Sequence, residues 1–292
     1  MANRCRISVL TSFALIAFAA NSVLCRLALG EGAIDAVSFS TIRLVSGAFT
    51  LVCISAFIRK TKPGAVAGDW VSAVVLFLYA VTFSLAYVTL SAGTGALILF
   101  STVQGTMIIA ALWSGERLKL LEWIGVATSL IGLIYLVFPG LSAPSPMGVA
   151  LMTIAGIAWG VYSLRGRRIN TPVETTTGNF MRSVPFALIL SLFIVQQAEI
   201  SQMGIFLGIT SGAVASGVGY VVWYAALRDL KVTHAAIVQL LVPVLAGFCG
   251  VVFLAEAVSL RLVLSAIGIL GGITMVVLSP SVGTSPMQSF TK

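Results

Sequence analysis

The sequence predicts an all-α polytopic membrane protein with ten transmembrane helices, arranged as two inverted five-helix repeats. Three observations lead to this prediction: the composition, a succession of long apolar runs, and a similarity between the two halves. Of 292 residues, 59% are hydrophobic and only 9% are charged, whereas a soluble domain carries about 25% charged residues. This is too little polar material to coat a soluble fold, so lipid is expected to cover most of the surface.

The apolar runs divide at charge clusters and at Gly/Pro breaks. A membrane-spanning helix needs about 20 mostly apolar residues, and runs that are continuously apolar favour helices over the alternating strands of a barrel. The first run exceeds the apolar core of a usual signal peptide, so it is expected to be retained as a helix. The predicted spans are 7–29, 34–58, 70–90, 93–114, 121–138, 147–165, 175–197, 203–227, 233–254 and 260–279.

The basic residues between the spans predict the orientation in the membrane. If ten spans alternate in direction, 13 of the 17 basic residues fall on one side, and these are Arg4, Arg6, Arg59, Lys60, Lys62, Arg117, Lys119, Arg165, Arg167, Arg168, Arg228, Lys231 and Lys292. The positive-inside rule places that side, and both termini, in the cytoplasm. The net charge of +8 is spread over short clusters, which indicates contacts with anionic lipid headgroups and not a nucleic-acid surface.

Several kinds of chemistry are not expected from this sequence. The four cysteines have no CxxC spacing and His234 is the single histidine, so neither a metal site nor another cofactor is predicted. The phosphate-loop pattern GxxxxGK[ST] does not occur, which argues against nucleotide as a direct fuel. All nine acidic residues lie near the ends of predicted spans. An enzyme is therefore not expected, and neither is proton coupling through an acid at mid-membrane.

The two halves of the chain resemble each other in order. The stretch AANSVLCR at 19–26 aligns with AWGVYSLR at 158–165 at an offset of 139. Further pairs follow in sequence: Arg43 with Arg182, Tyr87 with Tyr224, Leu90 with Leu227, Ala96 with Ala236, Glu116 with Glu256 and Gly132 with Gly272. The predicted repeats are 1–140 and 141–292, the second with a short cytoplasmic tail. Since each holds five spans, the second inserts upside down, a plan typical of secondary transporters with a midplane substrate site.

Four stretches carry a resemblance to a known family. They are the polar end of the first span at 21–26, Arg43 within SFSTIRLVSG, SGERL at 114–118 and LAEAV at 254–258. Over nearly its whole length the chain resembles the drug/metabolite transporter superfamily, of the EamA type with two five-helix repeats. Within that group it looks most like bacterial amino-acid exporters of the YddG type, which export aromatic amino acids.

The resemblance implies a multi-pass protein of the bacterial inner membrane that moves a small molecule among membrane lipids, without a nucleotide. The chain departs from the family's usual first-helix Trp-Gly at Ala20 and Asn21, whereas Trp159 and Gly160 keep that pair in the second repeat. The oligomeric state stays open.

Aromatic residues recur at helical spacing in three predicted spans. Tyr79, Phe83 and Tyr87 lie four residues apart, which places them near one face of a helix. We expect such rings to line a central cavity for an amphipathic or aromatic solute, although an interfacial belt or plain helix packing gives the same spacing. With polar residues inside the spans, the predicted cavity set is Asn21, Tyr79, Phe83, Tyr87, Gln104, Trp159, Tyr162, Ser163, Tyr220, Trp223 and Gln239.

A second set is predicted to serve in gating or structure. Pro243 cannot donate to the carbonyl of Gln239, so the side chain and carbonyl of Gln239 are expected to offer polar groups at one depth of the ninth span, next to a point of bending. Arg43 and Arg182 could each attract a substrate carboxylate, but because both repeats carry one, a structural role is favoured. The set comprises Arg43, Arg182, Glu116, Glu256 and Pro243.

The predicted function is export of neutral or aromatic amino acids by alternating access between the two repeats. Efflux of drugs, or of another metabolite such as a nucleoside, remains an alternative within transport. A membrane subunit that does not itself transport is the remaining alternative.

Overall fold

A computed structural model describes residues 2–58, 67–113, 115, 118–140, 143–166, 169, 171–227, 239 and 241–278. Apart from one isolated backbone bridge between Ile34 and Ile200, the regular structure of these residues is helical. The helices are α1 (Ala2–Gly30), α2 (Ala36–Ile58), α3 (Trp70–Tyr87), α4 (Ala92–Trp113), α5 (Leu120–Val137), α6 (Pro146–Gly166), α7 (Pro172–Ile194), α8 (Gln202–Thr210), α9 (Gly219–Leu227), α11 (Leu241–Leu254) and α12 (Leu260–Leu278).

The described residues hold eight helical spans that are long and apolar enough to cross a membrane. Six are α2 to α7, one is the described part of α1, and one is the continuous run from α8 into α9. The ninth and tenth predicted spans correspond to α11 and α12, which are apolar but shorter in the part described. The ninth was expected to begin at 233, a position outside the described residues, and its described continuous part starts at Leu241.

The eighth span differs from the prediction of one regular helix. A π-helical segment, Ser211–Val218, joins α8 to α9. In a π-helix each backbone hydrogen bond joins residues five apart in the chain, one more than in an α-helix. Such segments are found frequently at functional sites. The small side chains in SGAVASGV allow close approach of neighbouring helices, so the segment can be wider than an α-helix and still pack tightly.

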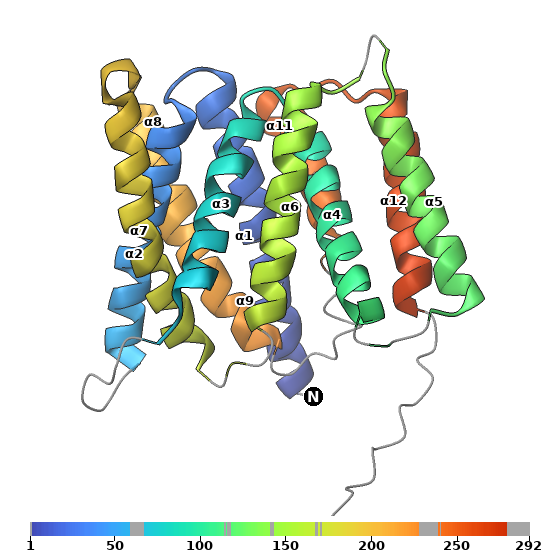
Figure 1. Ribbon diagram of the computed structural model, residues 1–292, viewed down its shortest axis with the longest axis horizontal. Coiled ribbons are helices and arrows are strands. Elements are labelled where there is room, and N and C mark those ends of the chain that lie inside the picture. Colours follow the sequence, from blue (N-terminus) through green and yellow to red (C-terminus); the bar gives the residue numbers. More distant parts are fainter. Residues whose placement is uncertain are drawn as a thin grey trace, which may run out of the picture.

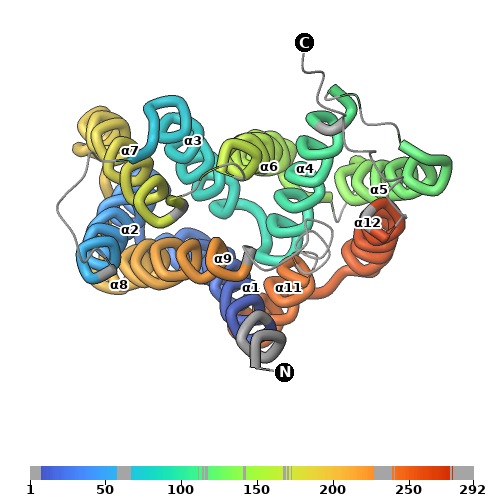
Figure 2. Tube along the Cα trace, turned by 90° about the horizontal axis from the view of Figure 1, so that it is seen from below, coloured from blue at the N-terminus to red at the C-terminus, as the bar shows by residue number. Residues whose placement is uncertain are grey.

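The helices stand side by side and alternate in direction, as Figure 1 shows. The start of α1 and the end of α12 lie at the lower face of that view. Seen along the helices in Figure 2, α5 and α12 form one end of an elongated outline, and α2, α7 and α8 form the other. Between them lie α1, α3, α4, α6, α9 and α11.

The packing is the same when the two halves are exchanged. Helix α2 packs on α7, α4 on α11, and α5 on α12. In the predicted repeat, α1 corresponds to α6, α3 to α8 with α9, and α4 to α11. Accordingly, α3 packs on α6 as α8 and α9 pack on α1, and α4 packs on α6 as α11 packs on α1. In Figure 1 the members of each exchanged pair run in opposite directions. This pattern agrees with the predicted inverted repeat.

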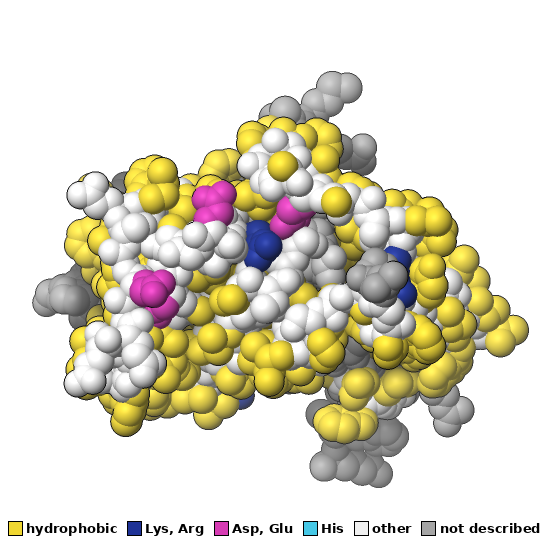
Figure 3. Space-filling model, turned by 90° about the horizontal axis from the view of Figure 1, so that it is seen from above, with side chains coloured by type: hydrophobic (Ala, Val, Ile, Leu, Met, Phe, Trp, Pro, Cys, Tyr) yellow, Lys and Arg dark blue, Asp and Glu magenta, His cyan; other side chains and the backbone are white. Residues whose placement is uncertain are grey.

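The outer surface is apolar, as a lipid-covered protein requires. Many large hydrophobic side chains are exposed, and Phe57 and Trp113 reach 88% and 89% exposure. Proteins surrounded by water rarely expose such large apolar surfaces. Hydrophobic side chains make up most of the rim in Figure 3, and charged side chains are sparse on the face shown there. The largest fully buried side chains include Arg43, Tyr87, Phe39 and Phe83.

Candidate functional site

A small cavity lies at the centre of the bundle, enclosed by side chains from five helices. Its lining is mainly aromatic with a polar patch on α1, and consists of Phe18, Asn21, Ser22, Tyr79, Phe83, Leu99, Phe100, Trp159 and Tyr220. The cavity has a volume of about 20 Å³, which is room for about one water molecule. A solute the size of an amino acid does not fit into this volume unless the surrounding helices move apart.

Trp159 is the hub of the aromatic cluster around the cavity. Its ring centroid lies 4.9 Å from those of Tyr79 and Tyr220 and 6.3 Å from that of Phe18. The ring pairs are tilted or edge-on, which are the arrangements that aromatic quadrupoles favour. Since the four rings come from α1, α3, α6 and α9, one side chain joins both predicted repeats at the cavity.

The π-helical segment supplies polar contacts to the cavity wall. The Ser211 hydroxyl donates to Asn21 Oδ1 at 2.6 Å, and both side chains are buried. A buried amide in a membrane helix needs such a partner. Ser216, on the same segment, accepts a hydrogen bond from Arg43 Nε at 3.1 Å. The segment thus holds a polar group of α1 and one of α2.

Arg43 lies behind the aromatic wall and is 2% exposed. Its Nη2 donates to the Tyr79 hydroxyl at 3.2 Å, and its guanidinium carbon lies 5.2 Å and 5.0 Å from the ring centroids of Tyr79 and Phe83. Its Nη1 is buried without a hydrogen-bond partner. The Tyr220 hydroxyl is also buried without a hydrogen bond of ordinary geometry.

Five of the predicted cavity residues therefore line this cavity: Asn21, Tyr79, Phe83, Trp159 and Tyr220. Tyr87 does not, because it lies at the end of α3, where its hydroxyl donates to the Ala92 carbonyl at 3.4 Å. Trp223 packs edge-on against Phe18 at 5.7 Å, behind the lining.

Tyr162 lies below Trp159 and stacks on it, with ring centroids 5.7 Å apart. Its hydroxyl accepts from Asn179 Nδ2 at 3.3 Å, and it lines a second, smaller cavity of about 10 Å³. Gln104 is buried and Ser163 half-buried, and neither lines the central cavity.

The remaining predicted residues lie elsewhere. Gln239 is half-buried and helical, but it does not line the central cavity. Pro243 lines a groove on the flank of the bundle. Glu116 lies outside the described residues. Arg182 donates through Nη1 to the carbonyl oxygens of Ala67 at 2.9 Å and Gly178 at 3.1 Å.

A polar cluster that we name the upper clamp lies at the upper ends of the helices in Figure 1, formed by Arg26 and Glu256 with the backbone around them. Arg26 Nε lies 3.4 Å from Glu256 Oε1, and Arg26 Nη1 donates to the carbonyls of Tyr87 and Val88 at 3.0 Å. Glu256 also accepts from the backbone N–H of Ala92. The clamp thus ties the ends of α1, α3 and α4 to Glu256, two residues after the end of α11.

Replacing Glu256 by glutamine is expected to loosen the upper clamp. The amide oxygen can still accept from Ala92, but the charge attraction to Arg26 is lost, and a half-buried ion pair of this kind is worth about 1 kcal/mol or more. The reporter is Cys25, which is fully buried beside Arg26. With the other three cysteines replaced by serine, a membrane-impermeant maleimide should label it severalfold faster.

The matched control for this labelling is Glu199→Gln, because Glu199 is an exposed acid near the same face. Its backbone carbonyl accepts a hydrogen bond from the N–H of Asp35, which the substitution does not change. It should leave the labelling rate of Cys25 unchanged. Equal rates for wild type and Glu256→Gln would show that the ion pair does not hold this end closed.

The lower clamp lies at the opposite end of the bundle and consists of Arg165, Asp69 and Ser72. Arg165 Nη2 donates to Asp69 Oδ1 and Arg165 Nε to Ser72 Oγ, both at 2.9 Å. Asp69 also caps α3 by accepting from the Ser72 N–H. Partial burial raises the pKa of Asp69, but the hydrogen bonds from Ser72 and the charge of Arg165 outweigh it, so the pKa lies below the usual 3.8.

The lower clamp is therefore expected to be insensitive to pH near neutrality. A carboxyl whose pKa is lower in the folded than in the unfolded state stabilises the fold above its unfolded pKa, and loses that effect as the pH falls through the folded value. The melting temperatures of wild type and Asp69→Asn in detergent should differ by a constant amount from neutral pH down to about pH 5. The difference should shrink as the pH falls through the folded pKa of Asp69, which lies below 3.8. A difference that changes between about pH 6 and 8 would assign the titration to another group.

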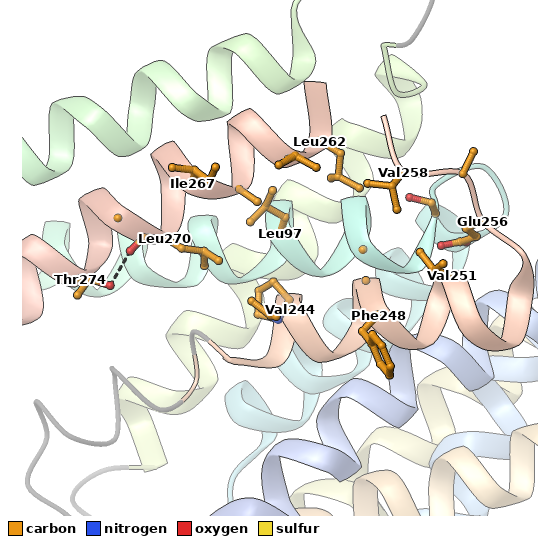
Figure 4. A pocket seen from close by; sticks show the side chains of 18 residues that line it. Leu97, Val244, Phe248, Val251, Glu256, Val258, Leu262, Ile267, Leu270 and Thr274 are labelled. Atoms are coloured by element: carbon orange, nitrogen blue, oxygen red, sulfur yellow. Dashed lines mark hydrogen bonds between the residues drawn. The ribbon is translucent and has the colours of Figure 1, made fainter. Parts of the chain in front are cut away.

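A groove of about 730 Å³ lies on the flank, between α4, α11 and α12 (Figure 4). Its apolar lining includes Leu97, Val244, Val251, Leu262, Ile267 and Leu270. Its polar groups are already bonded: Glu256 belongs to the upper clamp, and the Thr274 hydroxyl donates to the Leu270 carbonyl. Such a lining fits lipid acyl chains better than a zwitterion, so the central cavity is the better candidate site.

Sequence reasoning missed several groups at the central cavity. Phe18 lies three residues before Asn21, a spacing that places both on one helix face. This spacing was a signal from which Phe18 could have been predicted as a lining residue. Leu99 and Phe100 carried no signal, because they lie in a run that is apolar all round. The described residues contain no cluster of three or more His, Cys, Asp or Glu side chains able to hold a metal ion.

Comparison with known proteins places the chain in a family. The model of the EamA-like transporter family matches it twice, over residues 7–138 and 146–278. An uncharacterized protein of Pseudomonas aeruginosa is 45% identical over 97% of this chain and 98% of its own length. The uncharacterized inner membrane transporter YedA of Escherichia coli is 33% identical over 30% of this chain and 28% of its own.

A solved crystal structure shares the fold, with a TM-score of 0.63 and 20% identity over 91% of this chain and 98% of the other. The two family matches cover almost all of the apolar runs. The chain is a multi-pass membrane protein that belongs to the EamA-like transporter family.

Proposed function

We propose that the protein is a secondary transporter that exports small amphipathic metabolites, in the first place neutral or aromatic amino acids. The observation that carries this proposal is the central cavity, where six aromatic rings and Asn21 form the wall and the buried Arg43 lies against two of the rings. Rings can hold an apolar side chain, and the adjacent polar groups can hold the charged atoms of an amino acid. The cavity offers no pair of acids, nucleophile with base or metal cluster among its lining residues, so transport is favoured over catalysis.

The position of the two clamps supports alternating access as the mechanism. They lie at opposite ends of the bundle, and each is built on an arginine near the end of the first helix of a predicted repeat, Arg26 of α1 and Arg165 of α6. These two arginines correspond in the alignment of the halves. Opening one clamp while the other stays closed would expose the cavity to one side at a time. The ten-span topology and the repeat bounds 1–140 and 141–292 belong to this proposal.

The proposed location is a bacterial inner membrane, with the lower face of Figure 1 in the cytoplasm. The positive-inside distribution of basic residues supports this orientation. The YedA relative is named an inner membrane transporter, which supports the location.

Efflux of apolar drugs, or of a nucleoside, is the second candidate. The flank groove of about 730 Å³ favours the drug alternative, because an apolar solute could reach the protein through the lipid. A substrate of that kind would show no competition by amino acids.

Counterflow in proteoliposomes tests the amino-acid proposal directly. Vesicles loaded with unlabelled phenylalanine should accumulate labelled phenylalanine above empty liposomes without any ion gradient, and threonine in its place tests whether the rings select the cargo. Phe83→Ala should lower this uptake, whereas Phe193→Ala, which removes a ring that is 80% exposed, should not. Absence of counterflow for both amino acids would place drug or other metabolite efflux first.

A further inference from the structure

Arg43 carries a charge that the protein does not neutralise. It lies seven residues into α2, about 10 Å along the helix axis from the first residue, and is fully buried. The ion pairs among the described residues are Arg26 with Glu256 and Arg165 with Asp69. The ionisable groups that act on Arg43 are Tyr79, Tyr220 and Cys25, all of which are neutral near neutral pH in their usual state.

A guanidinium at this depth is costly unless something compensates it. Charged side chains within the membrane are rare, and they usually pair with an opposite charge or line a path for a substrate or ion. The rings of Tyr79 and Phe83 compensate in part, since each lies within the distance of a cation–π contact. They bring no negative charge, so the site stays one unit positive.

The unmet hydrogen-bonding groups belong to the cavity wall and to the guanidinium packed against it. Arg43 Nη1 has no partner, and neither has the Tyr220 hydroxyl, which belongs to a ring of the cavity wall. Tyr79, whose hydroxyl accepts from Arg43, belongs to the same wall. A buried unpaired donor costs free energy, and a ligand that accepts from it recovers that cost.

We infer that the transported solute carries a carboxylate, and that Arg43 is the residue that binds it. In this structure the rings of Tyr79 and Phe83 cover the guanidinium, and the cavity must widen before any solute fits. In the widened cavity the carboxylate accepts from Arg43 Nη1 and from the Tyr220 hydroxyl, and the apolar body of the solute lies against Trp159. This inference rests on the proposed transport function and names the chemical class of its substrate.

The other arginine of the repeat pair supports this assignment by contrast. Arg182 Nη1 is satisfied by two backbone carbonyls, and its guanidinium lies 5.9 Å from the ring centroid of Trp70, which does not line the central cavity. The structural role predicted for both arginines therefore fits Arg182. Arg43 occupies the equivalent position in the other predicted repeat, but its guanidinium lies against rings of the cavity wall. The site therefore has one anion-binding group and not a symmetric pair.

A ligand series on the purified wild-type protein tests the inference without any substitution. The ligands are phenylalanine, phenylalaninamide, which lacks the carboxylate, and 3-phenylpropanoate, which lacks the amino group. Isothermal titration calorimetry should show binding of both carboxylates and about tenfold to hundredfold weaker binding of the amide, as expected for a hydrogen bond to a charged group. Equal affinity for the acid and the amide would overturn the inference, and so would failure of all three to bind.

Arg43→Gln should then reduce the ratio of acid to amide affinity toward one. Arg182→Gln is the matched control, since it removes the corresponding charge of the other repeat and should keep the ratio. If Arg43→Gln does not fold, Arg43→Lys keeps the charge but not the planar fork, and should bind the carboxylates more weakly than wild type. A wild-type ratio in a folded Arg43→Gln, or wild-type affinity in Arg43→Lys, would overturn the assignment of Arg43.

The outcomes separate this inference from the proposed function. Counterflow of phenylalanine with equal binding of phenylalaninamide keeps amino-acid transport and removes the carboxylate site. Binding of 3-phenylpropanoate without counterflow of any amino acid keeps the carboxylate site and removes the amino-acid substrate.

Discussion

Replacing Gly212 by valine is expected to abolish the stable fold, or at least to lower its melting temperature by several degrees. A Cβ atom at this position would overlap the carbonyl oxygen of Arg43 and the hydroxyl of Ser46. The serine can rotate away, but the carbonyl belongs to the backbone of α2. Relief therefore requires α2 to separate from the π-helical segment, which would also break the hydrogen bond between Arg43 and Ser216.

The cost of such overpacking is about 1–3 kcal/mol or more in a close-packed core. Gly212→Ala should show a smaller loss of the same kind, measured as the melting temperature in detergent by size-exclusion chromatography with fluorescence detection. Gly271→Ala is the control, because a Cβ there meets no atom within 4 Å, and alanine is the better helix former. Equal melting temperatures for the two alanine variants would show that α2 and the π-helical segment are not in tight contact.

Trp159→Ala is expected to reduce transport at least tenfold. The indole contacts four other rings, three of which line the cavity, so its loss leaves a large void and removes the surface against which the solute would lie. Truncation of a buried tryptophan costs about 3–5 kcal/mol in stability. Initial counterflow rates must therefore be normalised to the amount of folded protein in the vesicles.

Trp113→Ala is the matched control, since that indole is 89% exposed and should be dispensable for transport. Trp159→Phe keeps an aromatic face and is expected to retain more activity than Trp159→Ala. Wild-type counterflow by folded Trp159→Ala would remove the aromatic cluster from the proposed site.

The sequence by itself determined the class of the protein and the approximate place of its helices. Spanning a bilayer is a local property of a run of about 20 residues, so composition and charge breaks suffice to find it. The start of α3 after Asp69 and the end of α4 at Trp113 lie within one residue of the predicted span limits. The family follows from short stretches that read in order along the chain, and the family model confirms it.

Only the tertiary structure decided which polar and aromatic residues meet. The spacing of Tyr79, Phe83 and Tyr87 predicted that they share one face of α3. The cavity extends along α3 only past Tyr79 and Phe83, so Tyr87 does not line it. The helix is apolar on all sides, so its sequence carries no contrast between a face toward lipid and a face toward a cavity. Likewise, nothing local distinguished Trp159 on the lining from Trp223 behind it.

The different environments of Arg43 and Arg182 arise in the same way. Their positions in the two repeats are equivalent, and the sequence therefore predicted one role for both. The partner of Arg43 Nε is Ser216, which lies 173 residues away in the chain on a π-helical segment that periodicity did not predict. Burial, hydrogen bonding and an unmatched charge are properties of contacts between helices, so they exist only once the helices have packed.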